Sequence, residues 1–157
     1  MSAGPFHFFY DGPFSQFARS EMTIDGEHYL CAEQYMMAQK ARLFRDAGAY
    51  LRIMKSERPA EIKAIGRQVY GFNDETWRAV ARDVVARGNL YKFQLDEFRE
   101  ALLETRFKTL AEASPTDVIW GIGLSMADVR RFDVAQWRGK NWLGQILTDL
   151  RISICGE

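Results

Sequence analysis

The sequence predicts a mainly α-helical α+β fold, built as one compact domain over residues 1–157 with a small β-hairpin near the N-terminus. Three observations lead to this prediction. A chain of 157 residues is long enough for a single domain with its own core. An Asp-Gly pair at positions 25 and 26 separates two short extended runs, as in a tight hairpin. Apolar residues recur at helical spacing through most of the remaining chain.

Short strands and turns are predicted for the first thirty residues. Aromatic side chains stand at alternate positions over residues 6–10, which is the period of a strand, and a turn follows at 11–13. After the Asp-Gly turn, residues 28–30 supply the return strand of the hairpin. The two histidines, His7 and His28, are therefore interpreted as strand side chains and not as catalytic groups.

The rest of the chain is predicted to be helical, in six segments. Pro59 suits the first turn of a helix, and Gly71 suits the region just beyond its end. The clearest helix begins at Asn73 or Asp74, because its apolar residues fall on one face through Gly88. The other helices are expected from Ala32 to near Asp46, over about 48–55, over about 59–69, over about 95–105, and from Asn141 onward.

Composition restricts the partners and the cellular location. Lys plus Arg equals Asp plus Glu, at 21 each, which argues against broad binding to a phosphate backbone. Cys31 and Cys155 lack metal-ligand spacing and a disulfide framework, so we expect a reducing compartment and no metal site. We expect neither a secretory signal nor a membrane span, and therefore a cytoplasmic protein, or a nuclear one in a eukaryote. A monomer is the default expectation.

Glu33 and Lys40 are the candidate catalytic pair, within the run E-Q-Y-M-M-A-Q-K. On a helix they share one face, two turns and about 10 Å apart. That separation exceeds the i,i+3 and i,i+4 spacings at which helical ion pairs form. A carboxylate and an amine on one face of a helix suit the lining of a pocket. The alternative interpretation is that the two side chains are unrelated charges exposed to solvent.

Two glycine-containing segments are candidate ligand loops. In the first, S-P-T-D at 114–117 resembles a helix start capped by Asp117, and Trp120-Gly121-Ile122-Gly123 follows. Glycine permits close approach of a ligand to the backbone, and Trp120 can stack on a base, or it can pack in the core. In the second, W-R-G-K-N-W-L-G at 137–144, Asn141 is expected to cap the last helix, whose N-terminus offers N–H groups to a phosphate.

Further candidate contacts lie outside these loops. Ser15 and Gln16 stand in an N-terminal loop beside Phe17, and Arg67 is either a phosphate ligand or an exposed side chain. No Walker loop, Rossmann glycine pattern or H-E-x-x-H motif occurs in the sequence. The complete set of candidate ligand-binding residues is Ser15, Gln16, Phe17, Arg67, Asp117, Trp120, Gly121, Gly123, Gly139 and Asn141.

The ordered series of motifs resembles the NADAR family, also called YbiA-like. It comprises F-S-Q-F, T-I-D-G, A-E-Q-Y-M-M-A-Q-K, G-R-Q-V, K-F, L-L-E-T, W-G-I-G-L and W-R-G-K-N-W-L-G-Q-I-L. The match runs from about Phe8 to Arg151, and the domain core is expected over about 8–152. One departure is Gln16, where the family usually has Asn.

The resemblance implies an α-rich fold and hydrolysis of an N-glycosidic bond to ribose, without a cofactor. It also implies that Glu33, Lys40, Trp120 and Asn141 belong to the site. Two substrate classes are associated with the family: ADP-ribose attached to guanine in DNA or RNA, and ribosylamino-pyrimidine phosphates of riboflavin biosynthesis. Because the sequence carries no fused pathway domain, we expect the first. A module that binds ADP-ribose or a ribose phosphate without cleaving it is the competing hypothesis.

Both substrates carry ribose on an exocyclic amine, which suggests a mechanism. The nitrogen lone pair can open the ribose ring, and the Lys40 amine can exchange into the resulting imine. Glu33 would then move protons while water hydrolyses the Schiff base. In a non-covalent alternative, Glu33 or Asp117 activates water and Lys40 binds phosphate.

Overall fold

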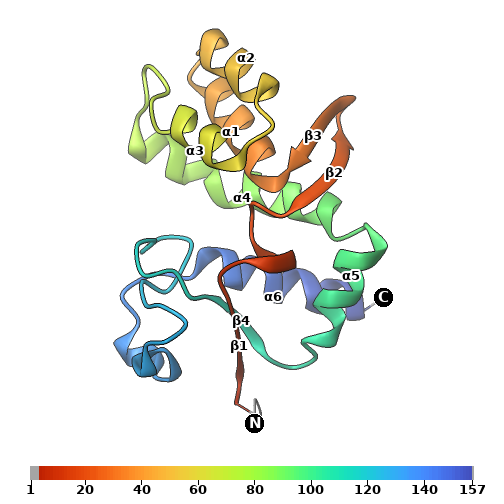
Figure 1. Ribbon diagram of the computed structural model, residues 1–157, viewed down its shortest axis with the longest axis vertical. Helices are drawn as coiled ribbons and strands as arrows, with labels where there is room; N and C mark the ends of the chain where they lie inside the picture. The colour runs from red at the N-terminus through yellow and green to blue at the C-terminus, as the bar shows by residue number, and fades with distance from the viewer. Residues whose placement is uncertain (1–3, 157) are drawn as a thin grey trace. The chain divides into compact units, whose positions relative to one another are not determined.

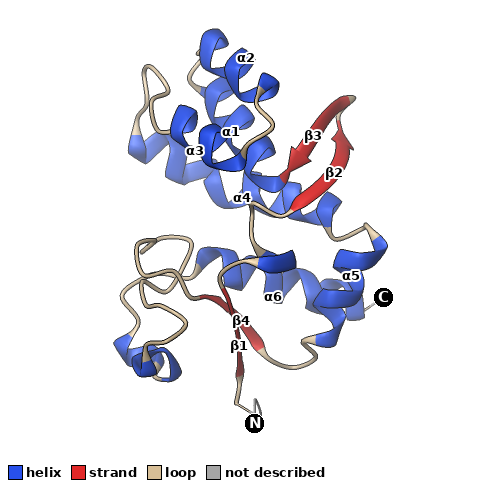
Figure 2. Ribbon diagram, in the orientation of Figure 1, coloured by secondary structure: helices blue, strands red, loops and turns tan. Residues whose placement is uncertain are grey.

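The computed structural model describes residues 4–156, which form two compact units (Figure 1). Unit 1 comprises the described residues up to Ser15 and from Asp96 onward, and unit 2 comprises Gln16–Leu95. Helices predominate and the sheets are small (Figure 2), so the predicted mainly helical α+β fold is confirmed. Over residues 4–156, no helix has the length and apolar character needed to cross a bilayer.

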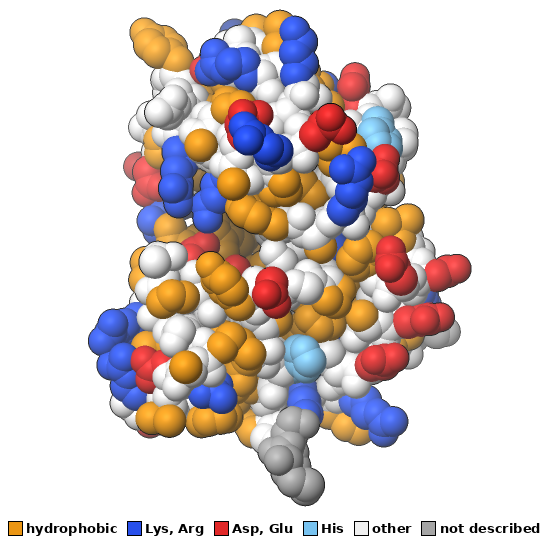
Figure 3. All heavy atoms as spheres, in the orientation of Figure 1, with side chains coloured by type: hydrophobic (Ala, Val, Ile, Leu, Met, Phe, Trp, Pro, Cys, Tyr) orange, Lys and Arg blue, Asp and Glu red, His pale blue; other side chains and the backbone are white. Residues whose placement is uncertain are grey.

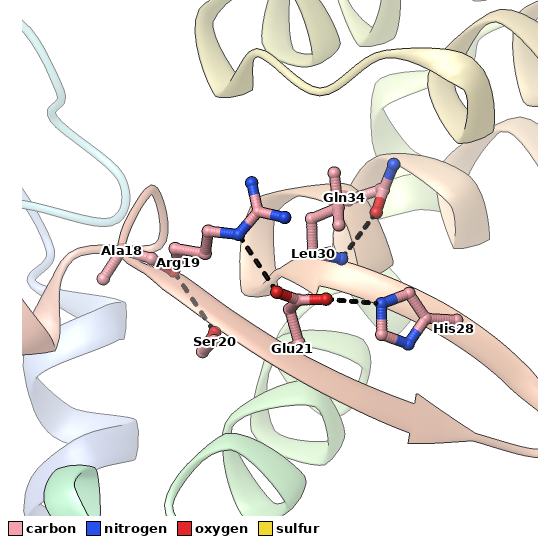
Figure 4. A network of polar contacts seen from close by, with 7 residues as sticks. All are labelled: Ala18, Arg19, Ser20, Glu21, His28, Leu30 and Gln34. Carbon is pink, nitrogen blue, oxygen red and sulfur yellow. Dashed lines mark hydrogen bonds and ion pairs between the residues drawn. The ribbon is translucent and has the colours of Figure 1, made fainter.

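Unit 2 begins with the predicted hairpin, formed by β2 (Arg19–Ile24) and β3 (Glu27–Cys31). The strands pair antiparallel around a turn whose two central residues, Asp25 and Gly26, have φ angles of 53° and 81°. Positive φ at both positions is the requirement of a type I′ turn, and it explains the Asp-Gly sequence. On the hairpin, the exposed His28 shares a hydrogen bond with Glu21 at 3.1 Å (Figure 4), as expected for a strand side chain.

Four helices complete unit 2: α1 (Ala32–Leu43), α2 (Ala47–Lys55), α3 (Pro59–Gly66) and α4 (Asp74–Lys92). The first ends before the predicted boundary, because the Asp46 carboxylate accepts the Ala49 N–H at 2.9 Å and caps α2 instead. The third ends three residues before the predicted position 69. The fourth begins at the predicted residue, since Asn73 Oδ1 accepts the Thr76 N–H at 2.9 Å. The predicted core stripe of α4 includes four buried residues: Trp77, Ala81, Val85 and Gly88.

Unit 1 contains the strand predicted near residues 6–10, paired with a second strand that the sequence prediction missed. β1 (Phe6–Phe9) lies parallel to β4 (Thr109–Glu112), with Phe6 opposite Thr109. Helix α6 (Trp142–Cys155) packs on β4, where the Thr148 hydroxyl accepts the Leu110 N–H at 2.9 Å. The unit also contains α5 (Asp96–Glu104) and the short 3-10 helices η1 (Gly12–Phe14), η2 (Val129–Phe132) and η3 (Val134–Gln136).

Candidate functional site

Helix α1 carries Glu33 and Lys40, and buried polar contacts fix its position in unit 2. Gln34 is 1% exposed, and its side chain joins three segments of the unit. Its Oε1 accepts the Leu30 N–H at 2.7 Å (Figure 4), and its Nε2 donates to the carbonyls of Ile53 and Ser56. Because a buried amide is costly to leave unbonded, this network holds the start of α1 against β3 and α2.

Two glycines allow the other helices to approach α1 closely. A Cβ at Gly66 of α3 would collide with the side chain of Met37. A Cβ at Gly88 of α4 would lie 2.9 Å from the ring of Tyr35. Contacts this short are not tolerated between real atoms, so α1 is packed directly against the backbones of both neighbours. The helix that bears the candidate catalytic pair is therefore a rigid support.

Glu33 lies in the first turn of α1 and is buried, with 6% of its surface exposed. The positive end of the helix dipole stabilises a carboxylate at this position. Its main-chain N–H donates to the carbonyl of Gln16 at 3.0 Å, which ties the F-S-Q-F loop to the start of the helix. The structure therefore places Gln16 beside Glu33.

Lys40 lies in the last turn of α1 and is partly buried against aromatic rings. Its Nζ is 4.5 Å from the ring centre of Phe72 and 5.9 Å from that of Trp77. The Phe72 ring is itself supported by Phe44, at a centroid distance of 5.4 Å. These rings restrict the amine to one region and remove part of its hydration.

Neighbouring charges also act on the Lys40 amine. Burial lowers the pKa of Lys40 from its ordinary value, and the positive charge of Arg67 lowers it as well. The carboxylates of Glu33 and Asp74 act in the opposite direction, without cancelling the shift. Glu33 and Lys40 thus influence one another electrostatically along one helix, and a larger fraction of the amine is neutral near pH 7 than for a free lysine.

The other candidates in unit 2 are Gln16, Phe17 and Arg67. Gln16 Oε1 accepts a hydrogen bond from Asn89 Nδ2 at 2.9 Å, so the departure from the family's usual Asn still leaves a polar contact. Phe17 is 38% exposed, with Lys63 Nζ 5.8 Å from its ring centre. Arg67 is exposed and directly follows α3, which matches one of the two alternatives predicted for it.

In unit 1, residues 114–124 form an irregular loop and not the predicted helix start. Asp117 does act as a cap, but for a turn. Its Oδ1 accepts the N–H groups of Ile119 and Trp120 at 3.0 and 2.8 Å, and its own N–H donates to Ser114 Oγ at 3.2 Å. A short Asx turn satisfies the carboxylate locally, which is why the capping-box spacing at Ser114 does not lead into a helix.

The glycines of the two candidate loops are required by backbone packing. Side chains at Gly121 and Gly123 would meet Glu112 O at 2.9 Å and Arg138 Cβ at 2.8 Å, and a Cβ at Gly139 would collide with the Gly121 carbonyl. The Gly139 N–H donates to the carbonyl of Ile122 at 2.8 Å. These contacts join the two loops, so the Gly139 N–H is not free to bind an anion.

The predicted phosphate site at the start of α6 is corrected by the same hydrogen bonds. The N–H groups of Asn141, Trp142 and Leu143 donate to the carbonyls of residues 121, 119 and 120, at 3.0 to 3.1 Å. Loop carbonyls therefore already occupy the donors that the sequence interpretation assigned to phosphate.

Asn141 has a different role from the predicted helix cap. It has a φ of 55°, makes no capping hydrogen bond through its side chain, and is 4% exposed. Instead, Oδ1 accepts the Glu112 N–H at 3.1 Å, and Nδ2 donates to the Leu110 carbonyl at 3.0 Å. This position needs a side-chain amide and a residue that tolerates the left-handed backbone conformation. Asparagine meets both requirements.

Trp120 is half-buried, and its ring lies edge-on to Trp142 at 5.5 Å. Ser15, also in unit 1, follows η1 and donates its N–H to Gly12 O at 3.1 Å. The candidates thus fall into two groups. Unit 2 brings Gln16, Glu33, Lys40 and Arg67 together around α1, and the loops of unit 1 bring Asp117, Trp120, Gly121, Gly123, Gly139 and Asn141 together.

Sequence reasoning missed Phe72 and Asp74 as neighbours of Lys40. Both lie more than thirty residues from Lys40 in the chain, and Trp77, the third neighbour, was assigned only to the core. Spacing carries no signal for such contacts, because they arise where α4 and the residues just before it pack against α1.

Comparisons with known proteins agree on one family. The profile of the NADAR domain matches residues 3–155. N-glycosidase R617 of Acanthamoeba polyphaga mimivirus is 44% identical over 82% of this chain and 78% of its own length. N-glycosidase YbiA of Escherichia coli is 30% identical over 93% of this chain and 83% of its own length.

One solved structure and one plant protein are also similar to this chain. The NMR structure of E. coli YbiA superimposes with a TM-score of 0.79 at 28% identity, covering 99% of this chain and 88% of that one. The chloroplastic riboflavin biosynthesis protein PYRR of Zea mays is 31% identical over 83% of this chain, which corresponds to 19% of the plant protein.

Proposed function

The chain belongs to the NADAR family, and we propose that it is an N-glycosidase that hydrolyses the bond between ribose C1 and an exocyclic amine. Two relatives, R617 and YbiA, carry the name N-glycosidase, which supports this class of reaction. The observation that carries the proposal is the Lys40 amine, held against aromatic rings with a lowered pKa, on the same rigid helix as the buried Glu33.

We propose ADP-ribose attached to guanine in nucleic acid as the substrate. The amine of guanine donates its lone pair to C1 while Glu33 protonates the ring oxygen, so the bond between C1 and that oxygen breaks and an iminium ion forms. The neutral Lys40 amine adds to C1 and gives up a proton to the Glu33 carboxylate. Glu33 passes this proton to the guanine nitrogen, the guanine amine leaves, and a Lys40 Schiff base remains. Water then adds to C1 and releases both the sugar and the free lysine.

Lys40 suits the role of nucleophile because only the neutral amine attacks. An ordinary lysine, with a pKa near 10.4, is almost fully protonated at pH 7. Burial and the Arg67 charge increase the neutral fraction of Lys40, and Glu33 lies two turns away as the proton carrier. Asp117 is less suited as an alternative base, since its Oδ1 already accepts two main-chain N–H groups.

Borohydride trapping tests the covalent route. Incubation with substrate and borohydride should leave a reduced ribosyl adduct on the peptide that contains Lys40, detected by mass spectrometry. Lys40→Arg should abolish both the adduct and turnover, because a guanidinium does not form the imine. The matched control is Lys55→Arg, at an exposed lysine at the end of α2, which should retain both.

Turnover by Lys40→Arg without any adduct would instead support water attack assisted by Glu33, with residue 40 binding phosphate. Absence of turnover on every substrate, with tight binding of ADP-ribose, would support a binding module in place of an enzyme.

A second candidate substrate is a ribosylamino-pyrimidine phosphate, and the similarity to the plant riboflavin biosynthesis protein favours it. It presents the same ribose C1 on an exocyclic amine, so the same Lys40 and Glu33 chemistry applies. Values of kcat/KM for this compound and for DNA ADP-ribosylated on guanine separate the candidates. A higher value on the pyrimidine would overturn the nucleic-acid proposal.

A further inference from the structure

A pocket lies within unit 1, beside β1. Its volume is about 360 Å³, within the range of small-ligand sites. Three phenylalanines, Phe6, Phe8 and Phe132, line it together with Lys108 and Arg131. Among the described residues that line it, none is Asp or Glu. The lining therefore combines aromatic surface with positive charge and lacks a carboxylate that would repel an anion.

The aromatic rings form a connected array with one ring open to solvent. Phe8 lies 5.5 Å from Phe6 and 5.6 Å from Phe132, the latter in an edge-to-face arrangement at 85°. Phe132 remains 59% exposed, although exposure of a large apolar ring is unfavourable. Figure 3 shows hydrophobic and basic side chains close together over the region of η2 and η3, and η2 contains Phe132. An aromatic ring is thus available as a stacking platform.

Arg131 is held at this platform by specific contacts. Its guanidinium carbon is 4.1 Å from the ring centre of Phe132 and 5.4 Å from that of Phe8. Its Nη1 donates to the main-chain oxygen of Asp128 at 3.0 Å, whereas the carboxylate of Asp128 binds Arg130 at 2.6 Å. The positive charge of Arg131 is therefore directed to the rings, and the carboxylate of Asp128 is bound to a different arginine.

We propose that this pocket binds a nucleotide, with the base stacked on Phe132 and the phosphate held by Arg131 and Lys108. A planar ring and a negative charge are the two features that this lining recognises, and a nucleotide has both. Every base offers a face for stacking, and each phosphate offers oxygens to the cations. His7 completes the lining as a neutral ring at pH 7, because burial and the Lys108 charge lower its pKa.

The bound nucleotide is either a free molecule or one residue within single-stranded DNA or RNA. Titration of the whole protein with 5′-AMP, adenosine and a deoxyadenosine hexamer, followed by ¹H–¹⁵N NMR, distinguishes them. AMP should shift the amide signals of residues 6–8 and 126–132, and adenosine should bind more weakly. An affinity for the hexamer at least about tenfold above that for AMP identifies a strand, and equal affinities identify the free nucleotide.

Two variants test the assigned contacts. Phe132→Ala should weaken AMP binding about tenfold, the loss expected for one stacked base. Phe107→Ala is the matched control, since that ring is 97% exposed in the same unit and does not line the pocket. Arg131→Gln should weaken AMP more than adenosine.

Equal AMP affinities for the Phe132 and Phe107 variants would overturn the proposal. Amide shifts confined to other residues, or tighter binding of an acidic peptide containing phenylalanine, would also overturn it. Binding is measured here without turnover, so failure of this proposal leaves the proposed hydrolysis untouched.

Discussion

Replacing Asn141 by Ala should destabilise the folded protein, because the side chain bonds to β4 and not to a ligand. The substitution removes the acceptor of the Glu112 N–H and the donor to the Leu110 carbonyl, both on β4. A buried main-chain group left without its partner costs about 1–3 kcal/mol. Alanine at a φ of 55° adds about 1–2 kcal/mol. With two such groups, the expected loss is therefore about 3–8 kcal/mol, a large part of a typical stability of about 5–15 kcal/mol.

Urea unfolding followed by circular dichroism measures this loss, and the melting temperature should fall by roughly 10–25 °C. Asn141→Gly separates the two contributions. Glycine loses the same hydrogen bonds but tolerates positive φ, so it should be about 1 kcal/mol more stable than the alanine variant. If Asn141→Ala unfolds at the wild-type urea concentration yet loses activity, the assignment of Asn141 as a structural residue is refuted, and a ligand contact replaces it.

Three more predictions concern unit 2. Burial lowers the pKa of Lys92 to about 7 from 10.5, so the unfolded chain binds more protons between these values and stability should rise with pH across that window. Urea unfolding at pH 7, 8 and 9 should show a shallower rise for Lys92→Met, and an unchanged slope would contradict this. Leucine in Phe72→Leu keeps an apolar side chain beside the Lys40 amine but removes a cation–π contact worth about 0.5–1 kcal/mol, which favours protonated Lys40. The acidic limb of the pH profile of kcat/KM should therefore move about half a unit lower, and a shift upward would be inconsistent with a lysine nucleophile. Gly66→Ala should cost about 1–3 kcal/mol through collision with α1. Its control, Gly48→Ala, should be neutral or slightly stabilising in thermal unfolding, because the nearest atom to a Cβ there is 3.7 Å away.

Local sequence patterns predicted most of the secondary structure. The Asp25-Gly26 turn, the cap at Asn73 and the stripe from Trp77 to Gly88 each depend on residues within one or two turns of each other. Such signals are encoded in short segments, so a single sequence contains them. Boundaries were less accurate where two elements compete, as at Asp46, which caps α2 and so ends α1 early.

Contacts between distant segments were not predictable in the same way. β4 is only four residues long, and its partner strand lies about a hundred positions earlier, so neither periodicity nor a turn signal marks it. Asn141 has the residue type and position of a helix cap, but its side chain bonds β4. Within the candidate site, Glu33 and Lys40 were identified by spacing and resemblance, whereas Phe72 and Asp74 required the packed structure.

The pairing of β1 with β4 also has a consequence for the order of folding. Unit 2 is one continuous stretch, Gln16–Leu95, but unit 1 needs Phe6 and Thr109 together. During synthesis, β1 leaves the ribosome long before its partner strand exists, while all of α1 to α4 emerges in between. Closure of so long a loop is slow, since its entropy must be lost before the strands gain any contact. Helix α1, which carries Glu33 and Lys40, and helices α2 to α4 are therefore expected to assemble first, and β1 stays unpaired until β4 has left the ribosome.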